Sequence, residues 1–229
     1  MLFETANDRT AASITAARHL HAAASIDVAD TDCAALVLSG GSTPLECYRH
    51  LARLDLPWPK IAVTLSDERW VAPSDAASNA GMLTRELFTG QASEATFVPL
   101  WRDAPSPDDV VKDIAADVAA RLPRPYSAVL LGMGNDGHFA SLFPDADNLA
   151  AGLDPTNRAI CQVVRTNASP VPRISLTLTT LLDCREVVLL IFGAEKRAVL
   201  EAAAEGDLQV PVAALLHQDR KPVRVIWAP

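Results

Sequence analysis

The chain has 229 residues, of which 49% are hydrophobic, and it can bury one sizeable core within a single α/β domain. Its formal net charge of −8 argues against non-specific binding to nucleic acid, so any anionic ligand must be held by a local pocket. No apolar stretch approaches the roughly 20 residues that cross a bilayer, and residues 1–9 lack the basic-then-apolar order of a secretory signal. We therefore expect a cytoplasmic protein that does not bind membranes.

Apolar, β-rich runs alternate with helix-like stretches along the whole chain. In chain order, the predicted strands are residues 34–39, 61–66, 127–131, 173–178, 186–192 and 223–227. The predicted helices are residues 10–24, 45–54, 80–88, 108–122 and 195–205. This alternation predicts a doubly wound, mostly parallel sheet flanked by helices, in one α/β domain over residues 1–229. Ligands of such sheets bind beyond the carboxyl ends of the strands, so the residues that follow each strand are the site candidates.

Two regions and the cysteines fall outside this pattern. Residues 99–107 are rich in proline and are interpreted as a connecting loop, because an amphipathic helix follows at once. Residues 145–172 contain one weak strand candidate, at 159–164, and are predicted to form a surface excursion. The four cysteines are scattered without a CxxC pair, which favours free thiols over disulfides.

The first predicted strand ends in the sequence SGGSTP at residues 39–44. Gly40 and Gly41 let the backbone turn closely around a ligand, while Ser42 or Thr43 can cap the helix that follows. Such a turn points backbone N–H groups at an incoming anion, so a phosphate or carboxylate is a natural ligand. An ordinary strand-to-helix turn explains the same residues equally well.

The second predicted strand ends in SDERWV at residues 66–71. Adjacent carboxylates beside an arginine are more often a solvated salt-bridge cluster, and composition alone favours that interpretation. Arg69 nevertheless offers a planar donor fork that suits a carboxylate or a phosphate. Ser78 and Asn79 follow as a possible second cap.

The third predicted strand runs into GMGNDGHFASLFP at residues 132–144. The glycines match the dinucleotide motif G-x-G-x-x-G by spacing only, because Pro144 comes too early for the usual long helix. His138 lies two residues after Asp136 in this turn. A neutral imidazole can take a proton from water, and Asp136 can favour the imidazolium that results. Taken alone, this motif is explained slightly better by a surface or capping histidine.

Two cations follow further along the chain. Arg173 begins a predicted strand, and Lys196 lies where a strand meets a helix. They can converge on a phosphate, although either can equally be a surface charge. The chain has no G-x-S-x-G elbow, no H-E-x-x-H pair, no Walker loop and no Cys/His spacing for a metal. For a hydrolase, direct attack by a base-activated water is then the simplest remaining chemistry.

Taken in order, the segments SGGSTP, SDERWVAPSDAASN, GMGNDGHFASLFP, RISLTL, GAEK and PVAALL, with the terminal VRVIWAP, resemble the 6-phosphogluconolactonase family. The matches keep the family's order and spacing over nearly the whole chain. The resemblance implies a Rossmann-like fold shared with glucosamine-6-phosphate deaminases, a site at the strand ends, and no metal or organic cofactor. It also implies hydrolysis of 6-phospho-D-glucono-1,5-lactone to 6-phospho-D-gluconate in the oxidative pentose phosphate pathway. The expected partner is this phosphorylated sugar lactone, bound by a monomer or weak homodimer.

The resemblance also implies a role for individual residues. His138 is similar to the family's general base, and Asp136 to its polarising neighbour. The loop that faces the phosphate is expected to consist of Gly40, Gly41, Ser42 and Thr43. The charged contacts are expected to be Arg69, which orients the substrate, and Arg173 and Lys196, which hold the phosphate or the substrate.

Two details of the expected site stay open at this stage. The oxyanion formed during hydrolysis is expected to meet backbone N–H groups near Gly40 and Gly41 or near Gly134. Phe139 departs from the family, which commonly has a small hydroxyl residue after the histidine. This departure affects the local packing and one possible hydrogen bond, and leaves the base in place.

Two other functions compete with lactone hydrolysis. A deaminase-like isomerase binds a phosphorylated hexose in the same kind of site, but its loop after the histidine typically continues toward Asn and Glu. Here residues 141–144 read SLFP, so the extra carboxylate is missing. A catalytically silent sugar-phosphate sensor would need an attached DNA-binding segment or a partner surface, and neither is evident in the sequence.

Overall fold

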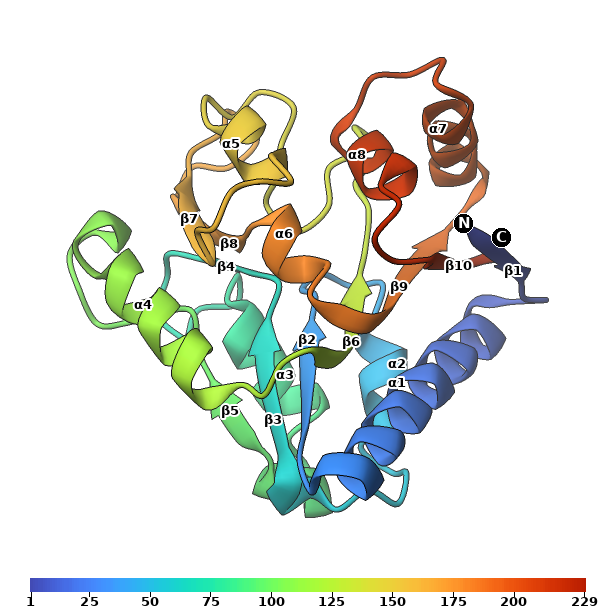
Figure 1. Ribbon diagram of the computed structural model, residues 1–229. Helices are drawn as coiled ribbons and strands as arrows, with labels where there is room; N and C mark the ends of the chain where they lie inside the picture. The colour runs from blue at the N-terminus through green and yellow to red at the C-terminus, as the bar shows by residue number, and fades with distance from the viewer.

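The computed structural model describes residues 1–229 and contains a large sheet of seven parallel strands (Figure 1). In chain order, these strands are β1 (Leu2–Thr5), β2 (Ala34–Leu38), β3 (Ile61–Leu65), β5 (Thr96–Val98), β6 (Tyr126–Leu131), β9 (Cys184–Phe192) and β10 (Val223–Ala228). Their order across the sheet is β1-β10-β9-β6-β2-β3-β5, and every neighbouring pair is parallel. The predicted doubly wound, mostly parallel sheet is confirmed.

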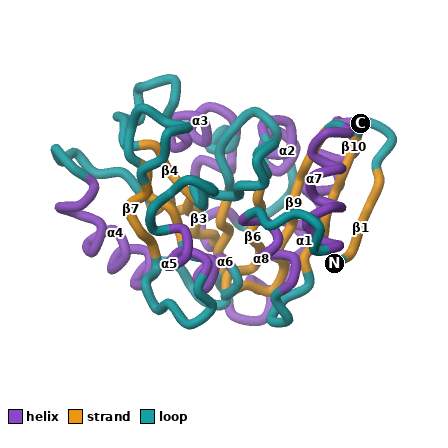
Figure 2. Tube along the Cα trace, turned by 90° about the horizontal axis from the view of Figure 1, so that it is seen from above, coloured by secondary structure: helices purple, strands orange, loops and turns teal.

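Eight α-helices and two short 3₁₀ helices connect the strands. They are α1 (Arg9–Thr31), α2 (Leu45–Leu51), α3 (Asn79–Glu86), α4 (Pro107–Arg121), α5 (Leu149–Leu153), α6 (Leu178–Leu181), α7 (Ala194–Glu205) and α8 (Pro211–His217), with η1 (Trp58–Lys60) and η2 (Gly90–Glu94). Seen from above, α2 and α3 lie on one side of the strands, and α6 and α8 lie on the other (Figure 2). No helix has both the length and the apolar character needed to cross a membrane.

The large sheet is buried on both faces. Every residue of β2, β3 and β6 is buried, and their sequences AALVL, IAVTL and YSAVLL are almost entirely apolar. Helices exclude water from both faces of such a sheet, so unbroken apolar runs replace the alternation of a half-exposed strand. These strands belong to one cluster of 59 buried hydrophobic residues, whose removal from water is the main favourable contribution to folding.

A smaller antiparallel sheet covers the carboxyl end of the large one. It consists of β4 (Asp67–Arg69), β8 (Arg173–Leu176) and β7 (Cys161–Val164), in that order. The strand predicted at 173–178 therefore belongs to the small sheet, and it is shorter than predicted. It ends because the side chain of Thr177 accepts a hydrogen bond from the Thr180 N–H and starts α6.

Several elements differ from the sequence prediction. Strands β1, β4 and β5 were not predicted, since segments of three or four residues are too short to show an alternation of apolar and polar residues. Helix α1 continues to Thr31, beyond the predicted end at residue 24, because no glycine or proline interrupts it. The excursion at 145–172 contains α5 and β7, and β7 matches the weak strand candidate.

The strand order reverses next to β2. From β2 the chain adds β3 and then β5 on one side, whereas β6 pairs with the other side of β2. The loops that follow β2 and β6 therefore diverge. In open α/β sheets, ligands bind in the crevice that this divergence leaves at the carboxyl ends of the strands.

Candidate active site

A cavity of about 230 Å³ lies at this switch point, where the loops after β2, β3, β6 and β9 meet. It is lined by Ser39, Gly40, Gly41, Ser42, Thr43, Asp67, Arg69, Asn79, Gly132, Met133, Gly134, His138, Ala140, Arg173 and Lys196. Every residue predicted for the site lines the cavity except Asp136, which instead contacts the ring of His138. The fold thus brings together residues that are widely separated in the sequence.

His138 lies in the tight turn that follows β6. Its Nδ1 lies 2.5 Å from Oδ1 of Asp136, and its backbone N–H donates to the same oxygen at 3.2 Å. An ionised carboxylate can only accept a hydrogen bond, so a neutral ring paired with it carries its proton on Nδ1 and its lone pair on Nε2. The ring also stacks on Phe143, with the centroids 4.0 Å apart. These contacts orient the imidazole, whose second nitrogen can accept a proton when the ring is neutral.

Gly134 allows this arrangement because it has no side chain. A Cβ atom there would lie 2.3 Å from Cε1 of His138 and 2.5 Å from Oδ1 of Asp136. The Gly134 N–H donates to the carbonyl of His138 at 2.9 Å and closes the turn. The absence of a side chain at Gly134 thus lets the side chains of His138 and Asp136 lie close to the backbone of the turn. The Gly134 N–H is therefore already used within the turn, and the oxyanion donors expected near Gly134 stay a prediction.

The loop after β2 presents unused backbone donors. The N–H groups of Gly40, Gly41 and Ser42 donate no hydrogen bond within the chain. Gly41 has a φ of 88°, a left-handed conformation that glycine adopts at little cost. Helix α2 begins at Leu45 without a side-chain cap, so the predicted cap by Ser42 or Thr43 is wrong. Their side chains instead belong to the cavity lining, in a loop suited to an anion.

Three cations line the cavity. Lys196 lies in the first turn of α7, and partial burial lowers the pKa of its ammonium group. Arg69 of β4 and Arg173 of β8 are cross-strand neighbours, and the Nε atom of each is buried without a partner. Burial lowers the pKa of Arg173, the charge of Asp67 opposes that shift, and Arg69 adds to it. Like charges directly opposite each other are destabilising, so this pair favours a bound anion.

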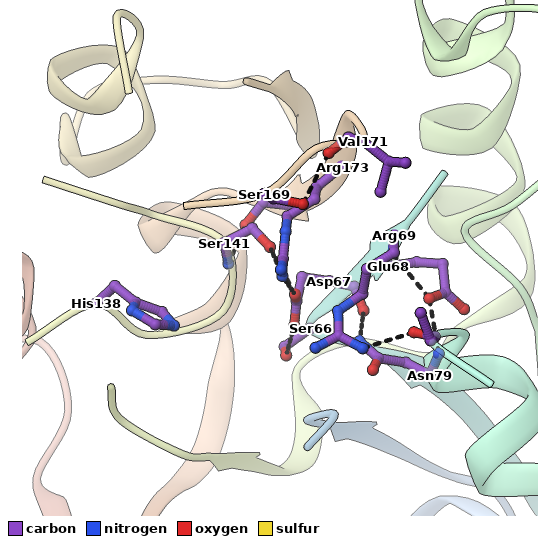
Figure 3. Close-up of polar contacts among 12 residues, drawn as sticks. Ser66, Asp67, Glu68, Arg69, Asn79, His138, Ser141, Ser169, Val171 and Arg173 are labelled. Carbon is purple, nitrogen blue, oxygen red and sulfur yellow. Dashed lines mark hydrogen bonds and ion pairs between the residues drawn. The ribbon is translucent and has the colours of Figure 1, made fainter. Parts of the chain in front are cut away.

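Asp67 lines the cavity and Ser141 contacts Asp67, and the sequence prediction gave a role in the site to neither. The Ser141 hydroxyl donates to Oδ2 of Asp67 at 2.6 Å, and Nη1 of Arg173 lies 3.6 Å from the same oxygen (Figure 3). The predicted solvated salt-bridge cluster is wrong, because Asp67 is only 5% exposed. The position of SDER in the sequence could have indicated this burial, since SDER directly follows β3, a strand whose residues are all buried.

Phe139, the departure from the family pattern, faces away from this chemistry. Its side chain is fully buried and belongs to the main hydrophobic cluster. Its carbonyl accepts a hydrogen bond from the Leu142 N–H at 3.0 Å. The four cysteines are free, as predicted. No three His, Cys, Asp or Glu side chains are grouped so that they could hold a metal ion.

The fold and the cavity define a class of protein: a doubly wound α/β protein with a loop of unused backbone N–H groups and a histidine–aspartate pair at its switch point. The chain belongs to the family of glucosamine-6-phosphate isomerases/6-phosphogluconolactonase, whose family model matches residues 7–227. The predicted family is therefore confirmed.

Individual relatives agree with this assignment. The chain is 45% identical over 192 residues to the 6-phosphogluconolactonase of Caulobacter vibrioides, covering 83% of this chain and 81% of that protein. It is 40% identical over 204 residues to the 6-phosphogluconolactonase of Mesorhizobium japonicum, covering 88% and 84% of the two chains. The crystal structure of a 6-phosphogluconolactonase from Shewanella baltica superimposes with a TM-score of 0.94 at 31% identity, covering 100% and 98%.

Proposed function

We propose that this protein is a 6-phosphogluconolactonase, which hydrolyses 6-phospho-D-glucono-1,5-lactone to 6-phospho-D-gluconate in the oxidative pentose phosphate pathway. The observation that carries this proposal is the His138–Asp136 pair beside a cavity with an unused anion-binding loop. Relatives named 6-phosphogluconolactonase support the same activity.

His138 is the general base of the proposed reaction. Its Nε2 removes a proton from water while the water oxygen attacks C1, and Asp136 stabilises the imidazolium that forms. When the tetrahedral intermediate collapses, the bond from C1 to the ring oxygen breaks, and the imidazolium returns the proton to that oxygen. Such base catalysis typically contributes about 10² to 10⁴-fold. Backbone N–H groups of a glycine-rich turn are proposed to stabilise the oxyanion, and the N–H of Gly134 itself is engaged by the carbonyl of His138.

The phosphate of the substrate is proposed to bind the loop at residues 40–43, Lys196 and Arg173, while Arg69 orients the substrate. The whole chain carries a net charge of −8, but the cavity lining has three cations and the single carboxylate of Asp67. Local charge therefore attracts a dianion that the rest of the molecule repels. Fixing the phosphate holds C1 against the base, so that remote binding energy is used for orientation.

Turnover of freshly prepared lactone by the pure protein tests the proposal, with every rate corrected for spontaneous hydrolysis. We expect rapid turnover of the phosphorylated lactone and a far lower kcat/KM for unphosphorylated gluconolactone. Equal kcat/KM values for the two lactones would contradict the phosphate anchor. Release of ammonia from glucosamine 6-phosphate would instead support a deaminase, and binding of 6-phosphogluconate without turnover would support a silent sensor.

We also propose that residues 1–229 act as one domain and as a monomer or weak homodimer in the cytoplasm. One cluster of 59 buried hydrophobic residues supports the single domain. The cytoplasmic location agrees with a charged sugar phosphate that cannot cross a membrane unaided. Sedimentation at the assay concentration tests the oligomeric state, and a stable higher oligomer would contradict it.

A further inference from the structure

Glu68 is a fully buried carboxylate that does not line the cavity. Its Oε1 accepts hydrogen bonds from the backbone N–H groups of Arg69 and Asn79, both at 2.8 Å. Its Oε2 accepts from the Ala80 N–H at 2.7 Å and from the Ser78 hydroxyl at 3.2 Å. One side chain of β4 therefore holds the first residues of α3, as Figure 3 shows in part.

These contacts exceed what the end of a helix requires. Ser78 already caps α3, because its side chain accepts a hydrogen bond from the Gly81 N–H at 3.0 Å. Burial raises the pKa of Glu68, while the backbone N–H groups of Ala80, Asn79 and Arg69 act in the opposite direction. All four of its hydrogen-bonding neighbours are donors, so the ionised carboxylate matches its surroundings. A buried charge of this kind costs free energy unless it is well hydrogen-bonded, and a cap alone does not need it.

The start of α3 contacts the site on two sides. Asn79 lines the cavity, and its Nδ2 donates to the carbonyl of Asp67 at 2.8 Å. The same amide lies against Gly40 of the phosphate-facing loop, where a Cβ atom would be 2.0 Å from Oδ1 of Asn79. Just before α3, the carbonyl of Ala77 accepts a hydrogen bond from Nη1 of Arg69 at 2.6 Å. A shift of this helix end would therefore move both the loop and the arginine.

We infer that Glu68 is a positioning residue of the lactone site, an inference that rests on the proposed function. Glu68 locks the start of α3 onto β4, so that Asn79 supports Gly40 and the Ala77 carbonyl directs Arg69. It acts through these residues and does not touch the substrate. Loss of these contacts should weaken recognition of the phosphorylated substrate. It should affect proton transfer at His138 less, because His138 belongs to a separate turn after β6.

The test replaces Glu68 by glutamine, which keeps the size of the side chain but sets an NH₂ group against N–H or O–H donors. In Glu68→Gln we expect KM for the phosphorylated lactone and Kd for 6-phosphogluconate to rise about tenfold or more, as when a charge-assisted hydrogen bond is lost. We expect KM for unphosphorylated gluconolactone to change much less. Glu86→Gln is the matched control, because Glu86 ends the same helix and pairs with exposed Arg49.

A purely structural role predicts a different result. A partly unfolded variant has fewer active molecules, so kcat would fall equally for both lactones while KM and Kd stayed unchanged. That outcome in Glu68→Gln would overturn the inference. Asn79→Ala should raise the same constants, and the double variant should be no worse than the more severe single variant, because both act along one route. Effects that multiply would show that Glu68 does not act through Asn79.

The experiment separates this inference from the proposed function. If the unaltered protein does not hydrolyse the phosphorylated lactone, the proposed function fails. If it does, and Glu68→Gln keeps a normal KM and Kd, only the positioning role fails. Circular dichroism of each variant checks its fold. Should Glu68→Gln not fold, unchanged constants in folded Asn79→Ala would still overturn the inference.

Discussion

The two sheets of this protein bury different kinds of side chain. In the large sheet, β2 and β6 bury apolar residues and carry the loops of the site at their ends. In the small sheet, β4 buries the carboxylates of Asp67 and Glu68, which are 5% and 0% exposed. Apolar burial stabilises a fold, whereas a buried charge costs free energy unless it is well hydrogen-bonded. The difference indicates that the large sheet supplies stability and the small sheet places charge.

Replacing His138 gives the largest expected effect, because it removes the chemistry carried by a loop of the large sheet. In His138→Asn we expect kcat to fall by about 10² to 10⁴, with a much smaller change in KM. His217→Asn, at the exposed last residue of α8, is the control and should behave normally. A folded His138→Asn variant with near-normal corrected kcat would point to Asp67 as the base.

Removing a large apolar side chain from the large sheet should lower the stability of the fold and leave kcat nearly unchanged. Leu36 is fully buried in β2, between β3 and β6, so Leu36→Ala should lower the free energy of unfolding by about 2 to 5 kcal/mol. Urea unfolding measures the change, and kcat below the transition should stay within about twofold, since ΔΔG values of distant sites are usually independent. Ile26→Ala, at an exposed position, is the control. A large loss of kcat in folded Leu36→Ala would break the division between the two sheets.

The two cations that are proposed to bind the phosphate allow a direct comparison of the sheets, because Lys196 follows β9 of the large sheet and Arg173 lies in β8 of the small one. We expect Lys196→Ala and Arg173→Ala each to weaken binding of 6-phosphogluconate by about 1.5 to 3 kcal/mol, the contribution of a hydrogen bond to a charged group. Titration calorimetry measures both. Arg197→Ala is the control, because Arg197 pairs with Glu201 outside the cavity. If only one of the two variants binds more weakly, a single sheet holds the phosphate.

Thiol labelling gives the smallest effect and probes how well the core excludes solvent. Burial raises the pKa of Cys161 and of Cys184 to about 12, and that of Cys47 further, so these thiols stay protonated near pH 8. We expect a thiol reagent to modify only half-buried Cys33 in the native protein, and all four cysteines in urea. Mass spectrometry identifies the modified residues. Rapid native labelling of Cys47 would show that the core opens more easily than its packing indicates.

Much of the fold could be predicted because its signals are local. Runs such as AALVL at β2 and YSAVLL at β6 are apolar throughout, as strands covered on both faces must be. Strand β8 was misplaced because RISL has the composition of a strand in either sheet, and pairing with β4 and β7 depends on distant residues. Strand β1 was missed because its four residues are too few to show a period.

The candidate site, like the fold, was predicted from the sequence only in part. Glycines after β2 and a histidine two residues after an aspartate are visible as motifs, and their order along the chain indicated the family. Asp67 and Glu68 were interpreted as solvated charges, because sequence does not show that the small sheet covers them. Asn79 was interpreted only as part of a cap, since its contact with Gly40 joins residues that are 39 positions apart.

The sequence by itself determined the parallel sheet, the family and most of the side chains that line the cavity, because apolar periodicity and short motifs are written in neighbouring residues. Only the tertiary structure decided which backbone donors are free, which charges are buried and which strands pair with each other. The Gly134 N–H is used by His138, whereas those of Gly40 and Gly41 are free. The physical reason is that burial and hydrogen bonding are properties of what surrounds a group, and its surroundings come from distant parts of the chain.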